Sequence, residues 1–578
     1  MMDQPAHPAP HPRPDLMKGA RGTDWQAMID AVWGPGRSAS EQTGIFQDFI
    51  ETLDHEYALF RNRNVNLNAL AAQYLAEIQG GVSKGRFQAV MNKMCLAVQN
   101  GHTSLINQDV YFTFPEPGVP LLIGHHYMNH PYFGACLTTD DHGIFVYDVV
   151  DNHPLNLEVG DRILGYDGRP WGELYQELLY EELPVGQGGW LTSDASFAYG
   201  WDTVAGSNWH LFTTIDIQKY SSGEVVHLPT SLMVEAAVGL SLQCTDQINQ
   251  EIPRPTAPDW VTWGVVPRGE KRIGFIRADG WTDDAETAWE QACLAMVDDP
   301  DLDGLIIDFR TNFGGNMFLS NAGLAHLFNT TVSTIDWGFR TIPSNHWAMG
   351  RQGAASYYDI PGNPADYFDK PIAVLLGPKT ISSGDQVALR MIYHPMVRTF
   401  GRQTSTSFDS PVSYDLAEYP ELYARFSKYD AGPADDFNSY YSYLGFPVDE
   451  EVWLNPADAR TGKDAVIEAA MEWIITDVSA VPLDPGATSR ISGIAPNPSN
   501  PITRIHFELK ETGPCRLDIY DLAGRLIAHR SWVNLEMGDH TFEWDGTLTS
   551  GAGAASGLYM VRLTAADGEA HSRFTLVR

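Results

Sequence analysis

The hydrophobic positions of this sequence change their period several times along the chain, and each change predicts a different structure. From about residue 24 to residue 103, apolar residues recur every three or four positions, as the buried side of a helix requires. This stripe, which we expect to be core, comprises Phe46, Phe49, Ile50, Leu53, Tyr57 and Phe60. From about residue 109 onward the pattern shortens to β-like runs. We therefore expect a helical region at 23–105 and β-rich segments at 106–172 and 173–264.

Strand and helix patterns alternate between residues 265 and 476. Apolar strand runs at 272–277, 304–310 and 371–376 are separated by helical patterns, which cover 284–297, the stretch from the TNFGGN turn to Phe328, and a segment that begins at Asp385. Strands separated by helices of this length predict βαβ units and a mostly parallel sheet. Candidate catalytic residues should then lie at the carboxyl ends of the strands.

The last part of the chain has a third type of sequence pattern. Residues 477–493 have the Pro, Gly, Ser and Thr composition of a linker, and residues 494–578 contain short β-prone runs separated by Gly, Asn and Asp. This spacing is typical of a β-sandwich. The fold class is therefore multidomain α/β, with an all-β immunoglobulin-like sandwich at the C-terminal end.

Composition narrows the classes of function. The chain of 578 residues has a net charge of −35, which disfavours nucleic-acid and membrane-surface binding because phosphates would be repelled. No apolar run is long enough to span a bilayer, and residues 1–22 lack the apolar centre of a signal peptide and predict a disordered tail. The five cysteines lie far apart, so their spacing indicates neither a disulfide framework nor a zinc site.

Three short segments contain residues that could perform chemistry. They are NGHTS with His102, DFRTNFGGN with Gly314, and GPKTISSGD with Ser382 and Ser383. Each alone has an ordinary explanation: a structural histidine, a βα turn, or a serine that caps a helix. Together they could supply a nucleophile, a base and the two N–H donors that an oxyanion needs.

The ordered segments GHTS, GDRILGYDG, DFRTNFGG and TISSGD resemble the C-terminal processing (tail-specific) peptidase superfamily, which includes the tricorn core. The resemblance implies a crotonase-like βαβ core at 265–476. It also implies Ser382 as nucleophile, Asp385 as the acidic residue of the serine motif, and the N–H groups of Gly314 and Ser383 as oxyanion donors. GDRILGYDG resembles part of a PDZ domain and implies a PDZ-like domain at 106–172.

The family uses two different bases. In one branch a lysine lies 25 residues after the serine, but this position is Ser407 here, so a Ser/Lys dyad is excluded on the alignment. The tricorn-like branch uses a histidine from the N-terminal side, which implies His102 as general base, although Gly101 replaces the serine that precedes it in that branch. That branch also has a glutamate near the end of the catalytic domain. Glu450 is our candidate for this acid, with Asp449 and Glu451 beside it.

The leading hypothesis is a serine peptidase that acts on protein or peptide substrates without a cofactor. A non-catalytic ligand- or peptide-binding relative is the alternative, since retinoid-binding repeats share the fold. An esterase of the α/β-hydrolase type is disfavoured because no G-x-S-x-G elbow is present. The cluster of His125, His126 and His130 lacks the spacing of a defined metal site, so no metal is expected.

The C-terminal segments IAPNPSNPITRIHFEL, HTFEWDG and SGLYMVRL resemble immunoglobulin-like modules of exported bacterial proteins, including the flagellar hook-capping domain and type IX sorting domains. Trp544 and Tyr559 are expected to point into the sandwich core. The resemblance implies a secreted or cell-envelope protein and possible contact with secretion machinery, although no signal peptide is visible in this sequence.

Overall fold

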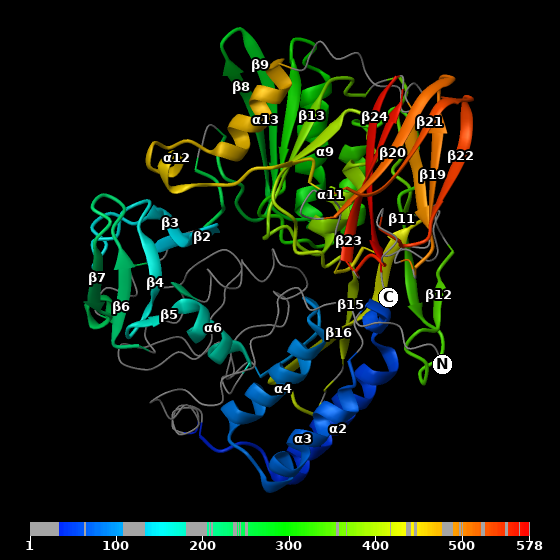
Figure 1. The fold of residues 1–578 in the computed structure, drawn as a ribbon. Helices are drawn as coiled ribbons and strands as arrows, with labels where there is room; N and C mark the ends of the chain where they lie inside the picture. The colour runs from blue at the N-terminus through cyan, green and yellow to red at the C-terminus, as the bar shows by residue number, and fades with distance from the viewer. Residues whose placement is uncertain are drawn as a thin grey trace. The chain divides into compact units, whose positions relative to one another are not determined.

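The computed structural model describes most of the chain between residues 30 and 576 (Figure 1). The residues not described are 1–29, 31–33, 63–64, 108–132, 181–204, 207–208, 210–211, 235–239, 241, 243, 249–251, 354–357, 366, 415, 417, 435–440, 444–447, 477–488, 496–498, 500, 522–525, 549–552, 556, 566 and 577–578. The predicted tail at 1–22 and the cluster of His125, His126 and His130 lie outside the described residues. The chain divides at residue 479 into two compact units.

A six-stranded sheet forms the centre of the first unit, with the order β17-β14-β13-β10-β9-β8. All neighbours are parallel except β8 and β9, which form a hairpin, so the predicted mostly parallel sheet is confirmed. The bounds are β8 (Val261–Arg268), β9 (Lys271–Ala278), β10 (Gly304–Asp308), β13 (Ile372–Leu376), β14 (Val397–Gly401) and β17 (Glu450–Glu451).

Helices cover both faces of this sheet because its central strands are apolar on both sides. Ile307 and Val374 face the cluster that includes α9 (Asp283–Val297) and α11 (Ser383–Met391). Ile306 and Leu375 face the opposite cluster, which includes α12 (Pro456–Arg460) and α13 (Ala465–Thr476). The helical pattern predicted to reach Phe328 is only partly realised, as the short 3₁₀ helix η5 (Met317–Ser320) and α10 (Asn321–Leu324).

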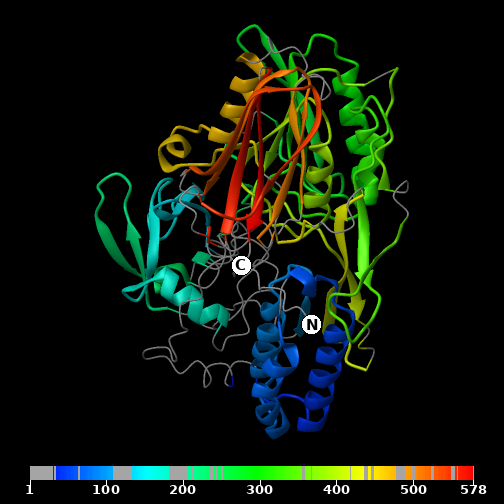
Figure 2. The same cartoon turned by 45° about the vertical axis from the view of Figure 1, so that its right-hand side comes forward.

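The N-terminal region is helical, as the sequence pattern predicts. It contains α2 (Ala39–Glu56), α3 (Leu67–Gly80) and α4 (Lys84–Val98), which pack side by side (Figure 2), and the 3₁₀ helix η1 (Ala58–Asn62). All six residues of the predicted stripe are buried. Ser38 and Glu41 form a capping box that fixes the start of α2.

A second sheet joins this helical region to the core. Its order is β1-β16-β11-β12, and β15 also pairs with β16. The strands are β1 (Ser104–Asn107), β11 (Ile335–Arg340), β12 (Met349–Arg351), β15 (Ser410–Tyr414) and β16 (Leu422–Pro433). Because β1 follows α4 directly and pairs with β16, this sheet brings the segment around His102 next to residues about 300 positions later in the chain.

A third sheet, which we call the insert domain, lies between these parts in sequence, with the order β2-β3-β4-β6-β7 and β5 beside β4. The predicted Asp167–Gly168 hairpin turn is confirmed, because both residues have positive φ between β4 and β5. The bounds are β2 (Ala135–Asp140), β3 (Gly143–Val149), β4 (Arg162–Tyr166), β5 (Arg169–Pro170), β6 (Thr214–Gln218) and β7 (Val225–Pro229), with helices α6 (Trp171–Tyr180) and α8 (Ser231–Val234).

The second compact unit is a β-sandwich. One sheet has the order β18-β19-β22 and the other β21-β20-β23-β24. Trp544 and Tyr559 lie in its buried core, which confirms the prediction from their alternation. The strands are β18 (Arg490–Ala495), β19 (Thr503–Leu509), β20 (Gly513–Asp521), β21 (Leu526–Leu535), β22 (Gly538–Trp544), β23 (Gly557–Ala565) and β24 (Gly568–Leu576).

Candidate active site

Ser382 lies in a strained turn between a buried strand and a helix. The strand β13 ends at Leu376, and Ser382 occupies the position before α11 with φ 61° and ψ −124°. Positive φ is uncommon for residues other than glycine, and strained backbone of this kind is concentrated at functional sites. The Ser382 side chain makes no capping hydrogen bond with α11, so a helix-capping role does not account for this serine. Its hydroxyl is partly exposed and bonds to none of the described residues.

The glycine turn after β10 lies directly against Ser382. Gly314 has φ 92°, and a Cβ atom placed on it would lie 2.7 Å from the Cβ of Ser382 and 2.9 Å from the carbonyl oxygen of Ile381. The two turns are also joined by hydrogen bonds, since the N–H of Ile381 donates to the carbonyl of Asn312 at 3.0 Å. Only glycine fits this approach, so the two segments predicted to act together are in contact.

The backbone N–H groups around the contact between Gly314 and Ser382 differ in whether they have a hydrogen-bond acceptor. The N–H of Gly314 donates to Asn312 Oδ1 at 3.0 Å, so this predicted oxyanion donor already has an acceptor. Within the described part of the chain, the N–H groups of Gly315 and Ser383 have no hydrogen-bond partner. Ser383 Oγ donates to the Gly315 carbonyl at 2.8 Å, which holds these two N–H groups near each other. The free donors beside Ser382 are therefore those of Ser383 and Gly315.

His102 forms a buried pair with Asp409, a residue that the sequence did not single out. His102 Nδ1 lies 2.7 Å from Asp409 Oδ2, and both side chains are almost completely shielded from solvent. Burial raises the pKa of the Asp409 carboxyl. The charge of His102 and hydrogen bonds from His102, Ser427 and Asn100 outweigh this effect and hold the pKa below its usual value. An ionised Asp409 can only accept, so the shared hydrogen is on Nδ1 and Nε2 is left as the basic nitrogen.

Neighbouring polar residues fix both members of this pair. Asn100 Nδ2 donates to Asp409 Oδ1 at 3.0 Å, while Asn100 Oδ1 accepts from the N–H of His102 at 3.0 Å. Ser427 Oγ lies within hydrogen-bond distance of Asp409 Oδ2 and, at 2.8 Å, of Asn100 Oδ1. The pair thus depends on the helical region, on β16 and on the segment before β15.

Gln386 connects this pair to the helix that starts at Ser382. Its Nε2 donates to the carbonyl of Phe408 at 2.9 Å, and its own N–H donates to the carbonyl of Ser382 at 3.1 Å. Gln386 Oε1 lies 3.1 Å from Ser383 Oγ. The residue next to Asp409 is therefore held one helical turn from Ser382, although the structure contains no hydrogen bond between Ser382 and His102.

Asp385, the acidic residue of the serine motif, bonds to the segment that precedes Asp409. It is buried, and it accepts hydrogen bonds from Ser405 Oγ at 2.8 Å and from the N–H of Ser407 at 2.9 Å. Burial raises its pKa to about 7, although hydroxyl and backbone donors of residues 404–407 oppose this shift. Asp385 thus anchors the segment that leads to Asp409. Ser407, which occupies the lysine position of the other branch, is one of its donors.

The raised pKa of Asp385 predicts a stability that depends on pH. Its folded-state pKa exceeds the usual value, so its contribution is complete at pH 4 and is lost as the pH rises through about 7. We expect the free energy of unfolding of the wild type to fall by roughly 1–4 kcal/mol relative to Asp385→Asn over this window. Denaturant unfolding of both proteins between pH 4 and 8 measures this, and parallel pH profiles would contradict it.

Glu450, the acid predicted to orient His102, does not contact it in the structure. Glu450 lies in the edge strand β17, and its carboxylate forms a partly exposed ion pair with Arg398 at 3.2 Å. Asp449 accepts hydrogen bonds from Thr399 instead. Among the described carboxylates, Asp409 alone bonds to the imidazole, in the place expected for Glu450.

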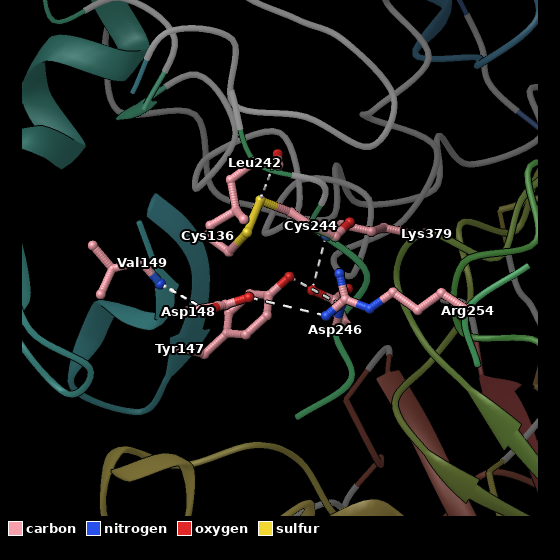
Figure 3. The surroundings of a disulfide bond; sticks show 9 residues. All are labelled: Cys136, Tyr147, Asp148, Val149, Leu242, Cys244, Asp246, Arg254 and Lys379. Atoms are coloured by element: carbon pink, nitrogen blue, oxygen red, sulfur yellow. Dashed lines mark hydrogen bonds and ion pairs between the residues drawn. A yellow bond between two sulfur atoms is a disulfide. The ribbon is translucent and has the colours of Figure 1, made fainter. Parts of the chain in front are cut away.

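A buried ion pair and a disulfide connect the serine turn to the insert domain (Figure 3). Lys379 Nζ lies 2.8 Å from Asp246 Oδ1, and the Asp246 N–H donates to the hydroxyl of Tyr147 on β3 at 2.9 Å. Cys244, two residues before Asp246, forms a disulfide with Cys136 on β2. Cysteine spacing did not predict this bond because the two cysteines are 108 residues apart.

Comparison with known proteins agrees with this architecture. Residues 272–430, which contain the glycine turn, Ser382 and Asp409, match the sequence model of Peptidase family S41. These residues form a peptidase family S41 domain. The resemblance to tail-specific peptidases is thereby confirmed for this part of the chain. Residues 503–569 match the FlgD Ig-like domain, which agrees with the β-sandwich of the second unit.

Two solved structures share the fold of this chain. Mature CPAF aligns with a TM-score of 0.56 at 11% sequence identity, covering 77% of this chain and 99% of that chain. Mature CPAF complexed with lactacystin aligns with a TM-score of 0.53 at 11% identity, covering 76% and 98%. No curated protein sequence matches this chain.

The described residues contain no group of three or more His, Cys, Asp and Glu side chains arranged to hold a metal ion. No described helix is long and apolar enough to cross a bilayer.

Proposed function

We propose that this chain is a serine peptidase in which Ser382 is the nucleophile, His102 the general base and Asp409 the acid that orients the base. The observation that carries the proposal is the buried hydrogen bond between His102 Nδ1 and Asp409, at 2.7 Å, in a core that matches a peptidase family. This bond leaves Nε2 as the atom that can accept a proton. Substrate binding must then bring Nε2 and the Ser382 hydroxyl into hydrogen-bond contact.

The reaction follows from these roles. His102 Nε2 removes the proton from Ser382 as its oxygen attacks the carbonyl carbon of a peptide bond, and the oxyanion forms beside the N–H groups of Ser383 and Gly315. Gly314 can become a further donor to the oxyanion only if the hydrogen bond from its N–H to Asn312 Oδ1 breaks. The protonated His102 then donates its proton to the leaving amine, and water hydrolyses the acyl-serine by the same path in reverse.

Labelling with a fluorophosphonate probe tests this function directly. The purified protein should become labelled once, and peptide mapping by mass spectrometry should place the label on Ser382. Hydrolysis of casein should be lost in parallel with labelling. A folded protein that is neither labelled nor active would instead favour the alternative, a ligand- or peptide-binding relative without catalysis.

A change at Gly314 tests the contact between the two turns. Gly314→Ala would place a methyl group against Ser382 Cβ at a backbone conformation that alanine rarely adopts. Displacing Ser382 and the oxyanion donors should lower kcat by about a hundredfold or more. Gly269→Ala is the matched control because Gly269 also has positive φ, at 63°, but its Cβ would meet no atom within 4 Å. Equal losses in kcat from both variants would contradict the proposed role of the contact.

The other parts of the chain suggest where the enzyme acts. We assign the insert domain a PDZ-like role in binding a substrate peptide as an added strand, on the basis of its GDRILGYDG segment and its antiparallel sheet. The C-terminal sandwich, from its similarity to the FlgD Ig-like domain, would direct an exported protein to the cell envelope. Fractionation of producing cells with and without residues 479–578 tests this role, and an unchanged distribution would contradict it.

A further inference from the structure

A pocket of about 270 Å³ opens beside the free N–H groups of the candidate active site. Gly315 and Ser383, which carry these groups, form part of its wall, and Gln386 and Ser410 form another part. Ser410 follows Asp409, and Ser383 follows Ser382. The pocket therefore lies between the nucleophile turn and the segment that carries the acid.

In the proposed reaction, the pocket lies on the acyl side of the scissile bond. In the proposed reaction the carbonyl oxygen points to the N–H groups of Ser383 and Gly315, and the leaving amine faces His102. The pocket contains both oxyanion residues in its lining and does not contain His102. A side chain that enters it must therefore belong to the residue whose carbonyl is attacked, which is called P1.

The lining is aromatic and carries no charge. Four of its side chains are the rings of Phe318, Trp337, Tyr358 and Tyr429, and Met317 adds a thioether. Phe318 and Tyr358 stack with ring centroids 5.6 Å apart, so this wall is already ordered before a ligand arrives. None of the lining residues is Asp, Glu, Lys or Arg. Burying a charged P1 side chain here would leave it without a partner, which is costly.

Four polar side chains of the lining, those of Asn316, Gln352, Ser383 and Gln386, bond to the protein itself. Gln352 Oε1 accepts from the hydroxyl of Tyr358 at 2.5 Å, and Gln386 bonds to Ser383 and Phe408. Asn316 Oδ1 accepts from the N–H of Phe318 at 3.1 Å. The pocket therefore offers a ligand the aromatic rings together with uncharged polar groups, which include the hydroxyls of Ser410 and Tyr429.

We infer that this pocket binds the P1 side chain and selects peptides with a large apolar residue, Phe or Leu, before the scissile bond. The inference rests on the proposed function. The volume of about 270 Å³ lies just below the range of pockets for drug-sized ligands, as expected for a single side chain. Full burial of a side chain such as Phe or Leu stabilises binding by about 1.5–3 kcal/mol, or roughly 10- to 150-fold in kcat/KM over a small side chain.

A set of fluorogenic peptides that differ only at P1 tests the specificity. With Phe, Leu, Ala, Asp and Lys at this position, kcat/KM should be at least tenfold higher for Phe or Leu than for Ala, and lowest for Asp and Lys. Gln352→Glu preserves the acceptor for Tyr358 and adds a negative charge to the lining. It should raise kcat/KM for the Lys peptide about tenfold or more and lower it for the Phe peptide.

The outcomes separate this inference from the function itself. Gln291→Glu, an isosteric change at an exposed position of α9 outside the pocket lining, is the matched control and should leave the order of P1 residues unchanged. Labelling at Ser382 with equal cleavage of all P1 peptides, or with no response to Gln352→Glu, would overturn the pocket assignment and leave the peptidase intact. Absence of both labelling and cleavage would overturn the proposed function, and the assignment with it.

Discussion

Replacing Ser382 by alanine is expected to lower kcat by roughly 10⁴- to 10⁶-fold and to abolish labelling by a fluorophosphonate. The reason is that, in the proposed mechanism, the Ser382 hydroxyl forms the acyl intermediate. It bonds to no described residue and is held at positive φ against Gly314. His102→Ala should cost about as much, and the double variant no more, because nucleophile and base act as a unit. Steady-state hydrolysis of one peptide by the three variants measures this.

The neighbouring serine supplies a matched control. Ser383→Ala removes a hydroxyl that bonds to Gly315 and Gln386 but leaves the N–H group in place, so we expect a loss in kcat of about tenfold or less. A loss at Ser383 as large as that at Ser382 would mean that the nucleophile has been assigned to the wrong serine. Additive losses for Ser382→Ala and His102→Ala would contradict a joint mechanism.

Local sequence pattern predicted the architecture around Ser382 because the signals there are short in range. The apolar run 372–376 is buried on both faces and forms a central strand, as its composition requires. The paired glycines of TNFGGN mark a turn, and both residues have positive φ. Such features depend on neighbours in sequence, so a single chain is enough to find them.

The pairing of Asp409 with His102 depends on contacts that no local sequence pattern encodes. Asp409 follows Phe408 in a segment without regular structure. Its hydrogen-bond partners Asn100 and Ser427 come from other parts of the chain. The family resemblance pointed to Glu450, which forms an edge-strand ion pair instead. Asp409 lies in the polar stretch TSTSFDS, which follows the carboxyl end of β14, where a catalytic side chain could be expected.

The same reasoning explains the disulfide. Cys136 and Cys244 are brought together by the pairing of β2 with β3 and by the contact of Asp246 with Tyr147. Both contacts form only in the tertiary structure. Cysteine spacing predicts such bonds in small disulfide-rich domains, but it carries little information over long separations.

The two candidate acids can be distinguished by a pair of isosteric substitutions. Asp409→Asn should lower kcat by about 10⁴-fold, whereas Glu450→Gln should leave it within about twofold. Asn100 donates to Asp409 Oδ1, so the oxygen of the new amide would take this position and its NH₂ group would face His102 Nδ1. Nδ1 would then have to accept, the ring hydrogen would move to Nε2, and His102 could no longer remove the proton of Ser382.

Measurements of folding distinguish a loss of catalysis from a loss of folded protein in these variants. Both variants should be examined by thermal unfolding, since a neutral amide at position 409 replaces a buried carboxylate whose pKa is lowered by its partners. A folded Asp409→Asn protein with a large loss in kcat and little change in KM supports the role of Asp409 in orienting His102. Full activity in Asp409→Asn together with a large loss in Glu450→Gln would restore Glu450 as the acid and show that the pair of His102 with Asp409 is structural. Because Glu450 already pairs with Arg398 at the edge of the sheet, that result would also require β17 to move toward His102 when substrate binds.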